Sequence, residues 1–137
     1  MTGFKKIFLD TAPIIYYLER NEYYFPVISA FFRAHHGAEY ITSVVTVSEY
    51  LPFPYRNGDL EAVNRFYTLI EKMPITVQVI DRGIAEKTAR IRAKYRFIKG
   101  MDALQLASAT ESECDLLLTN DRQLLQFDEI KCTVLDT

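Results

Sequence analysis

The sequence predicts an α/β fold with a central, mainly parallel five-stranded sheet and helices on both of its faces. Three observations lead to this prediction. Five short runs of β-branched or aliphatic residues recur along the chain, longer segments with helical spacing separate them, and 137 residues is the usual size of one domain. Strands that alternate with helices indicate parallel pairing, because a crossover helix returns the chain to the same end of the sheet. We therefore expect one domain over residues 1–137.

The expected strands and helices follow from short apolar runs and from the residues that bound them. The strands cover residues 7–9, 40–42, 75–80, 116–118 and 133–135. Helices are expected over residues 25–36, 44–51 and 60–72, with a further helix whose first turn contains Pro13. The residues that start or end these helices are Gly37, Ser43, Pro52, Pro54, Asp59 and Pro74.

The clearest helix follows Asp81 and presents one apolar stripe. Its buried positions recur at i, i+4, i+7, i+11 and i+14, namely Ile84, Thr88, Ile91, Tyr95 and Ile98. The remaining arc is basic and runs to Lys99, so it is open to solvent or to a ligand. The next segment, residues 101–113, has apolar side chains around most of its circumference. It predicts a largely buried helix with Asp102 in its first turn.

The charge of the chain is small in total but unevenly distributed. A net charge of −2 by itself argues against nucleic-acid binding. Residues 82–99, however, contain seven basic residues against one acidic residue, a local net charge of +6. The rest of the chain has nine basic against seventeen acidic residues. We therefore expect a basic strip and, elsewhere, a surplus of carboxylates.

Hydropathy and cysteine usage indicate a soluble, cytoplasmic protein. No apolar run approaches the roughly 18 residues of a membrane span, and Asp10 and Pro13 interrupt any signal-peptide core. The two cysteines, Cys114 and Cys132, provide neither a disulfide framework nor a metal motif. We expect them to be small core residues in a reducing compartment.

Four carboxylates stand where an ionised group needs a partner. Asp10 and Asp121 follow two expected strands, at the carboxyl edge where parallel sheets bind ligands. Asp102 begins a buried helix, and Glu49 lies in an otherwise apolar one. Burial of an unpaired charge costs several kcal/mol. A hard divalent cation resolves this conflict, and oxygen-rich clusters suit Mg²⁺ or Mn²⁺.

Each of these acids also has a purely structural interpretation. Asp10 is a good helix N-cap, Asp102 favours a helix dipole, and Asp121 is a common turn residue. Asp81 shows how weak a single signal is, because it follows a strand and simply caps the basic helix. The metal hypothesis therefore depends on the joint arrangement of the acids, and Glu49 is the hardest of them to explain otherwise.

Four segments make the chain similar to a known family. They are FLDTAPIIYYLE at the N-terminus, ITSVVTVSEYL near residue 45, KGMDALQLASA near residue 105 and DLLLTNDRQL near residue 120. In this order, the chain resembles the PIN-domain ribonucleases, especially the short VapC-like toxins of prokaryotic type II toxin–antitoxin pairs. The resemblance covers nearly the whole chain and implies a single PIN-like domain.

The resemblance implies which residues form the site. The implied catalytic residues and metal ligands are the acids of the four segments: Asp10, Glu49, Asp102 and Asp121. In the family these acids converge at the carboxyl edge of the sheet and hold one or two Mg²⁺ or Mn²⁺ ions. Thr119 and Asn120 match polar residues beside the last acid, and Thr11 matches a position whose hydroxyl often faces the site.

The implied activity is metal-dependent hydrolysis of RNA phosphodiester bonds by an endoribonuclease, with no side-chain nucleophile. Arg92, Arg96 and Lys99 are candidates for binding the phosphates of single-stranded RNA, although a solvated face explains them equally well. The surplus of aromatic residues predicts a partner surface, and the resemblance implies a homodimer and a small antitoxin protein. We expect His35 and His36 to lie at a solvated helix end, away from the chemistry.

Three other readings compete with this prediction. A haloacid-dehalogenase-like phosphotransferase needs a second aspartate at position 12, which is Ala12. A response-regulator receiver needs an acidic pair at the first strand and a lysine near the last strand. The last strand here runs KCTVLDT, so this family fits the sequence poorly. A non-catalytic PIN-like module that binds RNA or protein is the main alternative, and retention of all four acids argues against it.

Overall fold

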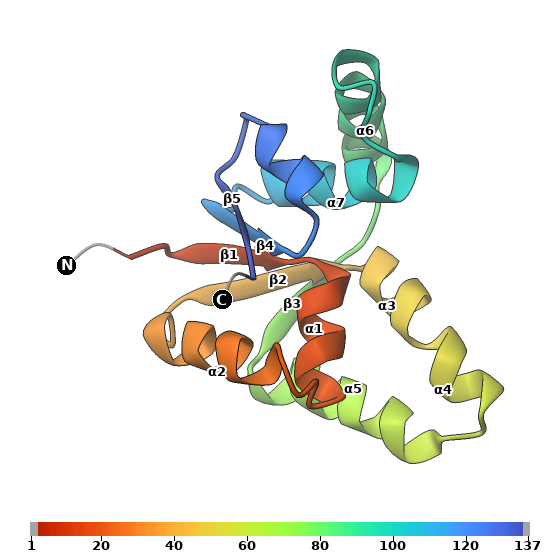
Figure 1. The fold of residues 1–137 in the computed structure, drawn as a ribbon. Helices are drawn as coiled ribbons and strands as arrows, with labels where there is room; N and C mark the ends of the chain where they lie inside the picture. The colour runs from red at the N-terminus through yellow and green to blue at the C-terminus, as the bar shows by residue number, and fades with distance from the viewer. Residues whose placement is uncertain (1–2, 136–137) are drawn as a thin grey trace.

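Five parallel strands form the centre of the protein in a computed structural model that describes residues 3–135 (Figure 1). The strands are β1 (Lys6–Leu9), β2 (Glu39–Ser43), β3 (Ile75–Gln78), β4 (Leu116–Thr119) and β5 (Cys132–Val134). Their order across the sheet is β3-β2-β1-β4-β5, and every pairing is parallel. The predicted α/β class is confirmed, with a sheet that is entirely parallel rather than mainly so. The two last residues, including Asp136, lie outside the described range.

The helices are α1 (Thr11–Leu18), α2 (Phe25–Ala34), α3 (Val44–Tyr50), α4 (Pro52–Arg56), α5 (Leu60–Lys72), α6 (Arg82–Lys94) and α7 (Gly100–Glu111), with a 3-10 helix η1 (Arg122–Gln126). Helix α5 has the predicted bounds. Pro52 does not stop helical structure as predicted, because it is the first residue of α4, where its missing N–H is not needed. No helix among residues 3–135 is long and apolar enough to cross a membrane.

The basic helix is shorter than predicted. Helix α6 ends at Lys94, and Tyr95 leaves the helical region of backbone conformation. Tyr95 and Ile98 are nevertheless buried, as the stripe predicted, because the chain turns back towards the core. The Tyr95 hydroxyl donates to Asp128 and fixes this turn. Lys99 therefore belongs to the start of α7, where it occupies the N-cap position.

Each face of the sheet has its own apolar core. Phe8 of β1 points to the face that α6, α7 and η1 cover, where it joins the cluster of Ile91 and Leu106. Its neighbours Ile7 and Leu9 point to the opposite face, the core that includes residues of α1, α2 and α5. This alternation buries β1 on both sides, as expected for the central strand of a parallel sheet.

The chain order reverses at β1 and thereby defines one edge of the molecule. From β1 the chain builds β2 and β3 on one side and then returns to place β4 and β5 on the other. The carboxyl ends of β1 and β4 are tied together, because the Asp10 N–H donates to the Leu118 carbonyl (3.0 Å). A crevice at such a reversal point is the usual ligand site of open parallel sheets.

The core can be tested with two adjacent aromatic residues of α5. Phe66 is 0% exposed and stacks on Tyr50 at 5.1 Å between ring centroids, whereas Tyr67 is 49% exposed. We expect Phe66→Ala to lower the free energy of unfolding by about 3–5 kcal/mol, because it leaves a cavity. Tyr67→Ala serves as the matched control and should cost less than about 1 kcal/mol. Urea unfolding followed by circular dichroism measures both, and equal losses would contradict the assigned packing.

Candidate active site

Asp10 stands at the reversal point, directly after β1, and receives hydrogen bonds from three elements. Its Oδ1 accepts from the Thr11 N–H of α1 (2.9 Å) and lies 3.3 Å from the Gln105 amide nitrogen of α7. Its Oδ2 accepts from the Thr119 hydroxyl of β4 (2.7 Å). Burial raises the pKa of Asp10, the negative charge of Glu49 adds to the rise, and the three donors counteract it. Asp10 is therefore both the cap of α1 and part of a larger polar site.

Glu49 reaches Asp10 through a threonine. The Thr11 hydroxyl donates to Glu49 Oε1 at 2.6 Å, and this contact joins α1 to α3. Glu49 itself is exposed, so the prediction that it stands buried in an apolar helix is wrong. Helix α3 is short and packs one side on the core through Val45 and Tyr50, which leaves its other side open. Glu49 thus faces the crevice from its solvent side.

Asp102 lies in the first turn of α7, beside these groups. In the part of the chain that the structure describes, its carboxylate has neither a hydrogen bond nor an ion pair. Burial raises the pKa of Asp102 to about 6, and the negative charges of Asp10, Asp121 and Glu49 add to this rise, while Lys99 lowers it. The four acids of the quoted segments therefore share one electrostatic environment.

The last residue of β4, Thr119, and the two residues that follow it supply the last group of polar side chains. Thr119 is fully buried, donates to Asp10 and accepts from the Asp121 N–H (3.1 Å). Asp121 Oδ1 accepts from the Gln123 N–H (3.0 Å) and so caps η1. Asn120 turns away towards α1, where its amide donates to the Tyr16 hydroxyl (3.1 Å). Thr119 is therefore the residue of this group that links it directly to Asp10.

A buried polar network lies beneath the carboxylates, and the sequence did not reveal it. Its members are Thr42, Ser43, Thr46 and Gln105, each at most 1% exposed. Gln105 contacts Ser43, Thr46 and Asp10, and Thr46 contacts Thr11. The sequence signal that could have revealed this network is Gln105, a large polar residue one helical turn after Asp102 in a helix that the sequence predicts to be largely buried.

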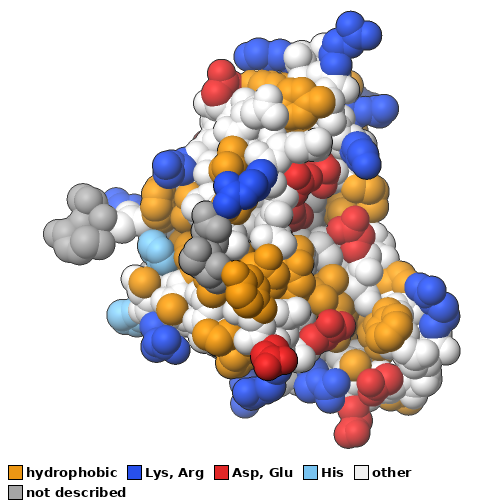
Figure 2. Space-filling model, viewed as in Figure 1, with side chains coloured by type: hydrophobic (Ala, Val, Ile, Leu, Met, Phe, Trp, Pro, Cys, Tyr) orange, Lys and Arg blue, Asp and Glu red, His pale blue; other side chains and the backbone are white. Residues whose placement is uncertain are grey.

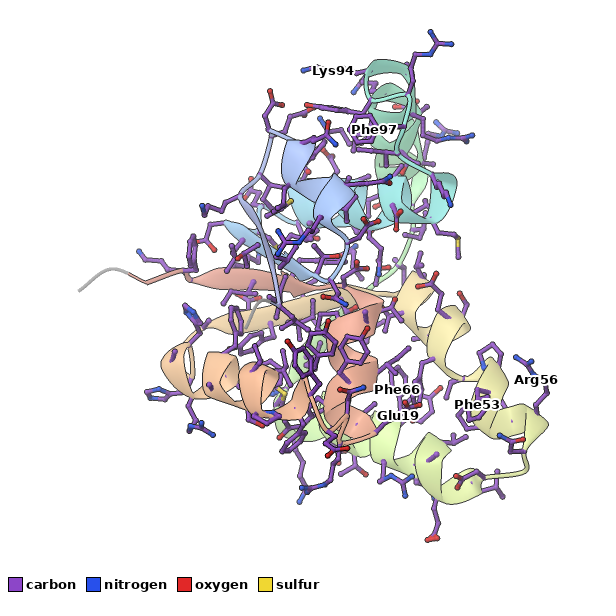
Figure 3. The ribbon with its side chains drawn as sticks, in the orientation of Figure 1. Glu19, Phe53, Arg56, Phe66, Lys94 and Phe97 are labelled. Carbon is purple, nitrogen blue, oxygen red and sulfur yellow. The ribbon has the colours of Figure 1, made fainter. Side chains whose placement is uncertain are left out.

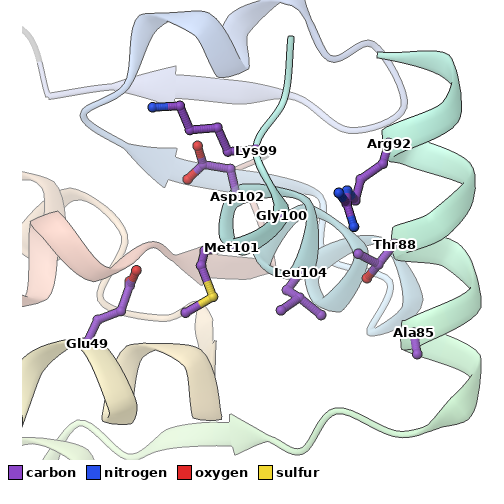
Figure 4. Close-up of a pocket in the computed structure, with 9 residues that line it drawn as sticks. All are labelled: Glu49, Ala85, Thr88, Arg92, Lys99, Gly100, Met101, Asp102 and Leu104. Atoms are coloured by element: carbon purple, nitrogen blue, oxygen red, sulfur yellow. The ribbon is translucent and has the colours of Figure 1, made fainter. Parts of the chain in front are cut away.

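A pocket of ≈ 650 Å³ opens beside Glu49 and Asp102, between α3, α6 and α7 (Figure 4). Arg92 of α6 and Lys99 line it together with apolar side chains, including Met101 and Leu104. Arg96 is exposed but does not line this pocket. Figure 2 shows acidic side chains near the middle of this view, with basic side chains over α6 above them. The pocket is thus acidic at one end and basic along another wall.

The carboxylates at this edge have the donor chemistry of a divalent-cation site but are not yet arranged as one. As they stand, the His, Cys, Asp and Glu side chains of residues 3–135 form no group of three or more that could hold a metal ion. Their chemistry does fit one, because Mg²⁺ and Mn²⁺ prefer carboxylate oxygens. The unpaired carboxylate of Asp102, beside three other acids, is the kind of charge that a cation stabilises.

The two histidines lie away from the four acids, as predicted. His35 and His36 follow α2 and precede β2, so they lie near the amino end of the sheet, opposite the acids. The His35 ring is partly buried and packs on Phe31 at 4.4 Å between centroids, so it is less solvated than expected. Cys114 is buried, Cys132 is partly buried, and both are free thiols.

Solved structures with the same fold include three toxin–antitoxin assemblies. The chain is similar to VapBC2 of Rickettsia felis bound to a promoter DNA fragment, with a TM-score of 0.81, 10% identity and coverage of 96% of this chain and 99% of that one. It is similar to a toxin–antitoxin complex of Klebsiella pneumoniae, with a TM-score of 0.74, 16% identity and coverage of 95% and 98%. DNA-bound VapBC of Salmonella typhimurium gives a TM-score of 0.70, 20% identity and coverage of 96% and 99%.

The sequence comparisons give a family but no individual relative. No curated protein matches the chain significantly. The family model of the PIN domain matches residues 7–130, which include all four acidic segments, strands β2, β3 and β4, and β1 except for Lys6. Because this match spans most of the sequence and agrees with the fold, the chain belongs to the PIN domain family.

Proposed function

We propose that the protein is an Mg²⁺- or Mn²⁺-dependent endoribonuclease whose metal ligands are Asp10, Glu49, Asp102 and Asp121. The observation that carries this proposal is the carboxylate of Asp102, which has neither a hydrogen bond nor an ion pair among the described residues and whose pKa is raised by burial and, in addition, by the other three acids. An acid kept in such a place without a counter-ion is typical of a functional site. The PIN domain family, to which the chain belongs, is typically a family of nucleases.

The chain's own side chains have separable roles in this proposal. A bound Mg²⁺ or Mn²⁺ supplies Lewis-acid stabilisation of the phosphodiester and lowers the pKa of water. Thr119 and Thr11 orient two of the ligands, since their hydroxyls donate to Asp10 and Glu49. Asp121 approaches from the far side of β1, on the segment that Thr119 anchors. No side-chain nucleophile is needed.

The RNA chain is assigned to the pocket beside Asp102. Its walls carry Arg92 and Lys99, which supply the attraction to phosphates that four carboxylates cannot. Met101 is 44% exposed at the same pocket and offers apolar surface to an unpaired base. Arg96 is placed further along the phosphate chain, and Phe97, 40% exposed at the tip beside Lys94 (Figure 3), is a platform for stacking.

We assign the protein the role of a toxin with a small antitoxin partner in the cytoplasm. Support comes from the fold that it shares with the toxin–antitoxin assemblies of Rickettsia felis and Klebsiella pneumoniae. A partner surface is also available, since large apolar side chains of α4 and α5 are exposed: Phe53, Tyr55, Leu60 and Tyr67. Arg56 lies on the outer side of α4 in Figure 3, whereas Phe53 lines a pocket together with residues of α1 and α5. We assign this patch to a homodimer contact.

A non-catalytic module that binds RNA or protein is the second candidate. It is favoured by one observation, that the described side chains do not already form a three-ligand metal group. Metal dependence of cleavage separates the two candidates, because a binding module retains RNA affinity in EDTA and cleaves nothing.

The first test is cleavage of RNA by the wild type with Mg²⁺ or Mn²⁺, with EDTA, and by Asp10→Asn and Asp102→Asn. We expect each substitution to lower the cleavage rate by at least about 100-fold, because each removes a ligand charge. A panel of structured and single-stranded RNAs should be used, since the substrate range can be narrow. If a folded wild type cleaves none of them, or if both variants keep full activity, the nuclease proposal fails.

The raised pKa of Asp102 predicts a pH-dependent stability difference. Its folded value of about 6 exceeds the ordinary value of 3.8, so protonated Asp102 favours the fold below pH 4, and this contribution is lost as the pH rises through about 6. Asparagine cannot ionise, so Asp102→Asn does not lose stability in this way as the pH rises. In EDTA the variant should therefore gain on the wild type between pH 4 and 7, by about 1 kcal/mol once solvent screening of this half-exposed group is included.

Differential scanning calorimetry across this pH range measures the difference. Saturating Mg²⁺ provides the control, because a bound cation should stabilise the ionised wild type and close the gap. A difference that does not change with pH would show that Asp102 ionises without hindrance.

The basic wall of the pocket gives a further prediction. In an Asp102→Asn background, which binds without cleaving, we expect Arg92→Gln to weaken binding of single-stranded RNA. It should also lower the slope of log affinity against log salt by about 0.7–1, since one phosphate contact is lost. Arg90→Gln is the matched control, because Arg90 is exposed on the same helix and does not line the pocket. Fluorescence anisotropy measures both, and equal effects would remove Arg92 from the RNA path.

A further inference from the structure

Gln105 is a buried amide whose two ends make contacts of opposite kinds. The side chain is 1% exposed on α7. Its Oε1 accepts a hydrogen bond from the Ser43 hydroxyl. Its Nε2 lies 3.0 Å from Thr46 Oγ1, 3.3 Å from Asp10 Oδ1 and 3.4 Å from Thr11 Oγ1. A buried amide of this kind is favourable only when its donors and acceptor are all satisfied.

The orientation of the amide follows from its neighbours. Ser43 Oγ accepts from the Val45 N–H (3.0 Å), which leaves its own hydrogen free for Gln105 Oε1. The reversed amide would place an oxygen against the carboxylate of Asp10, where both atoms accept and neither donates. Nε2 therefore faces Asp10, and its two hydrogens are directed to Thr46 and to the side of Asp10 and Thr11.

The hydroxyls beyond Gln105 have one consistent direction. Thr11 donates its single hydroxyl hydrogen to Glu49 Oε1. Thr11 must therefore accept from Thr46 in the contact of 2.9 Å between their hydroxyls. Thr46 has then used its own hydrogen and accepts from Gln105 Nε2. The chain of donors runs from Gln105 to Thr46, to Thr11 and to Glu49.

We propose that Gln105 is the positioning residue of this site, one amide that holds Asp10 directly and Glu49 through Thr46 and Thr11. It directs one N–H to the side of Asp10, just after β1, and the other to Thr46, from which the hydroxyl chain leads to Glu49 of α3; it thereby fixes the separation of the two carboxylates. Thr119 cannot replace it, because Thr119 contacts only the other oxygen of Asp10 and does not reach Glu49. The proposal rests on the assignment of Asp10 and Glu49 as metal ligands.

Gln105→Met tests this role, because methionine keeps the length and shape of the side chain and removes its donors. We expect Mn²⁺ affinity, measured by titration calorimetry without RNA, to fall by about 10-fold or more, as is usual when a residue that orients metal ligands is lost. Cleavage should lose kcat while KM for RNA stays within about two-fold, because the basic wall of the pocket is unchanged.

Two further variants and one control separate a positioning role of Gln105 from a general effect of a substitution in the core. Thr46→Val breaks the branch to Glu49, together with the Thr42–Thr46 contact (2.9 Å), but leaves the Gln105 amide beside Asp10. It should therefore lower Mn²⁺ affinity less than Gln105→Met does. Gln105→Glu keeps the acceptor for Ser43 but places a carboxylate against Asp10, so it should not rescue Mn²⁺ binding. Ser108→Ala is the control, since Ser108 is fully buried one turn further along α7 and its hydroxyl, among residues 3–135, bonds only to the Leu104 carbonyl (2.8 Å). Its Mn²⁺ affinity should match that of the wild type.

The outcomes separate this proposal from the proposed function. If the wild type binds Mn²⁺ and folded Gln105→Met and Thr46→Val bind it equally well, Gln105 is not a positioning residue. If the wild type binds no Mn²⁺, the nuclease proposal fails, and crystal structures of the wild type and Gln105→Met decide the positioning role. Unchanged Asp10 and Glu49 side chains in the variant would overturn it, and displaced ones would support it.

Discussion

Repulsion among carboxylates at one edge of the sheet is the constraint on which the rest of this structure depends. Asp10, Asp102, Asp121 and Glu49 come from four segments, and the pKa of Asp102 is raised first by burial and then by the charges of the other three acids. Such a group is tolerated only where neutral donors hold individual oxygens or where a cation enters. The fold supplies the neutral donors from its interior, through Thr11, Thr119 and Gln105.

The topology explains why these donors can reach the acids. Since the chain order reverses at β1, the residue after this strand is flanked by β4 on one side and by the start of α3, after β2, on the other. Helix α7 covers the same edge and is almost fully buried along one face, so Gln105 enters beneath the acids rather than beside them. A sheet without the reversal would separate Asp10 from either α3 or β4.

Much of this architecture could be predicted from local patterns, and the site only in part. Helix α5 and the buried stripe of α6 follow from spacing alone, because apolar periodicity reports which side faces a core. The end of α6 at Lys94 depends on tertiary contacts, such as that of Tyr95 with Asp128, whereas the start of α4 at Pro52 uses the tolerance of the first helical position for proline. The contact of Thr11 with Glu49 and that of Gln105 with Asp10 each join residues more than thirty positions apart. No local sequence pattern could predict these contacts or the exposure of Glu49.

The chemical type of the inner donors matters as much as their position. An arginine or lysine at position 105 could also hold Asp10, but its charge would neutralise the acid and reduce attraction for a divalent cation. An amide and three hydroxyls orient the same oxygens and leave their negative charge in place. Two cationic side chains, Arg92 and Lys99, lie instead on the pocket wall, where we propose that they bind phosphates; Lys99 is also near enough to Asp102 to lower the pKa of that carboxyl. Separating neutral donors beneath the acids from cations beside them allows one small edge to attract both a metal ion and a polyanion.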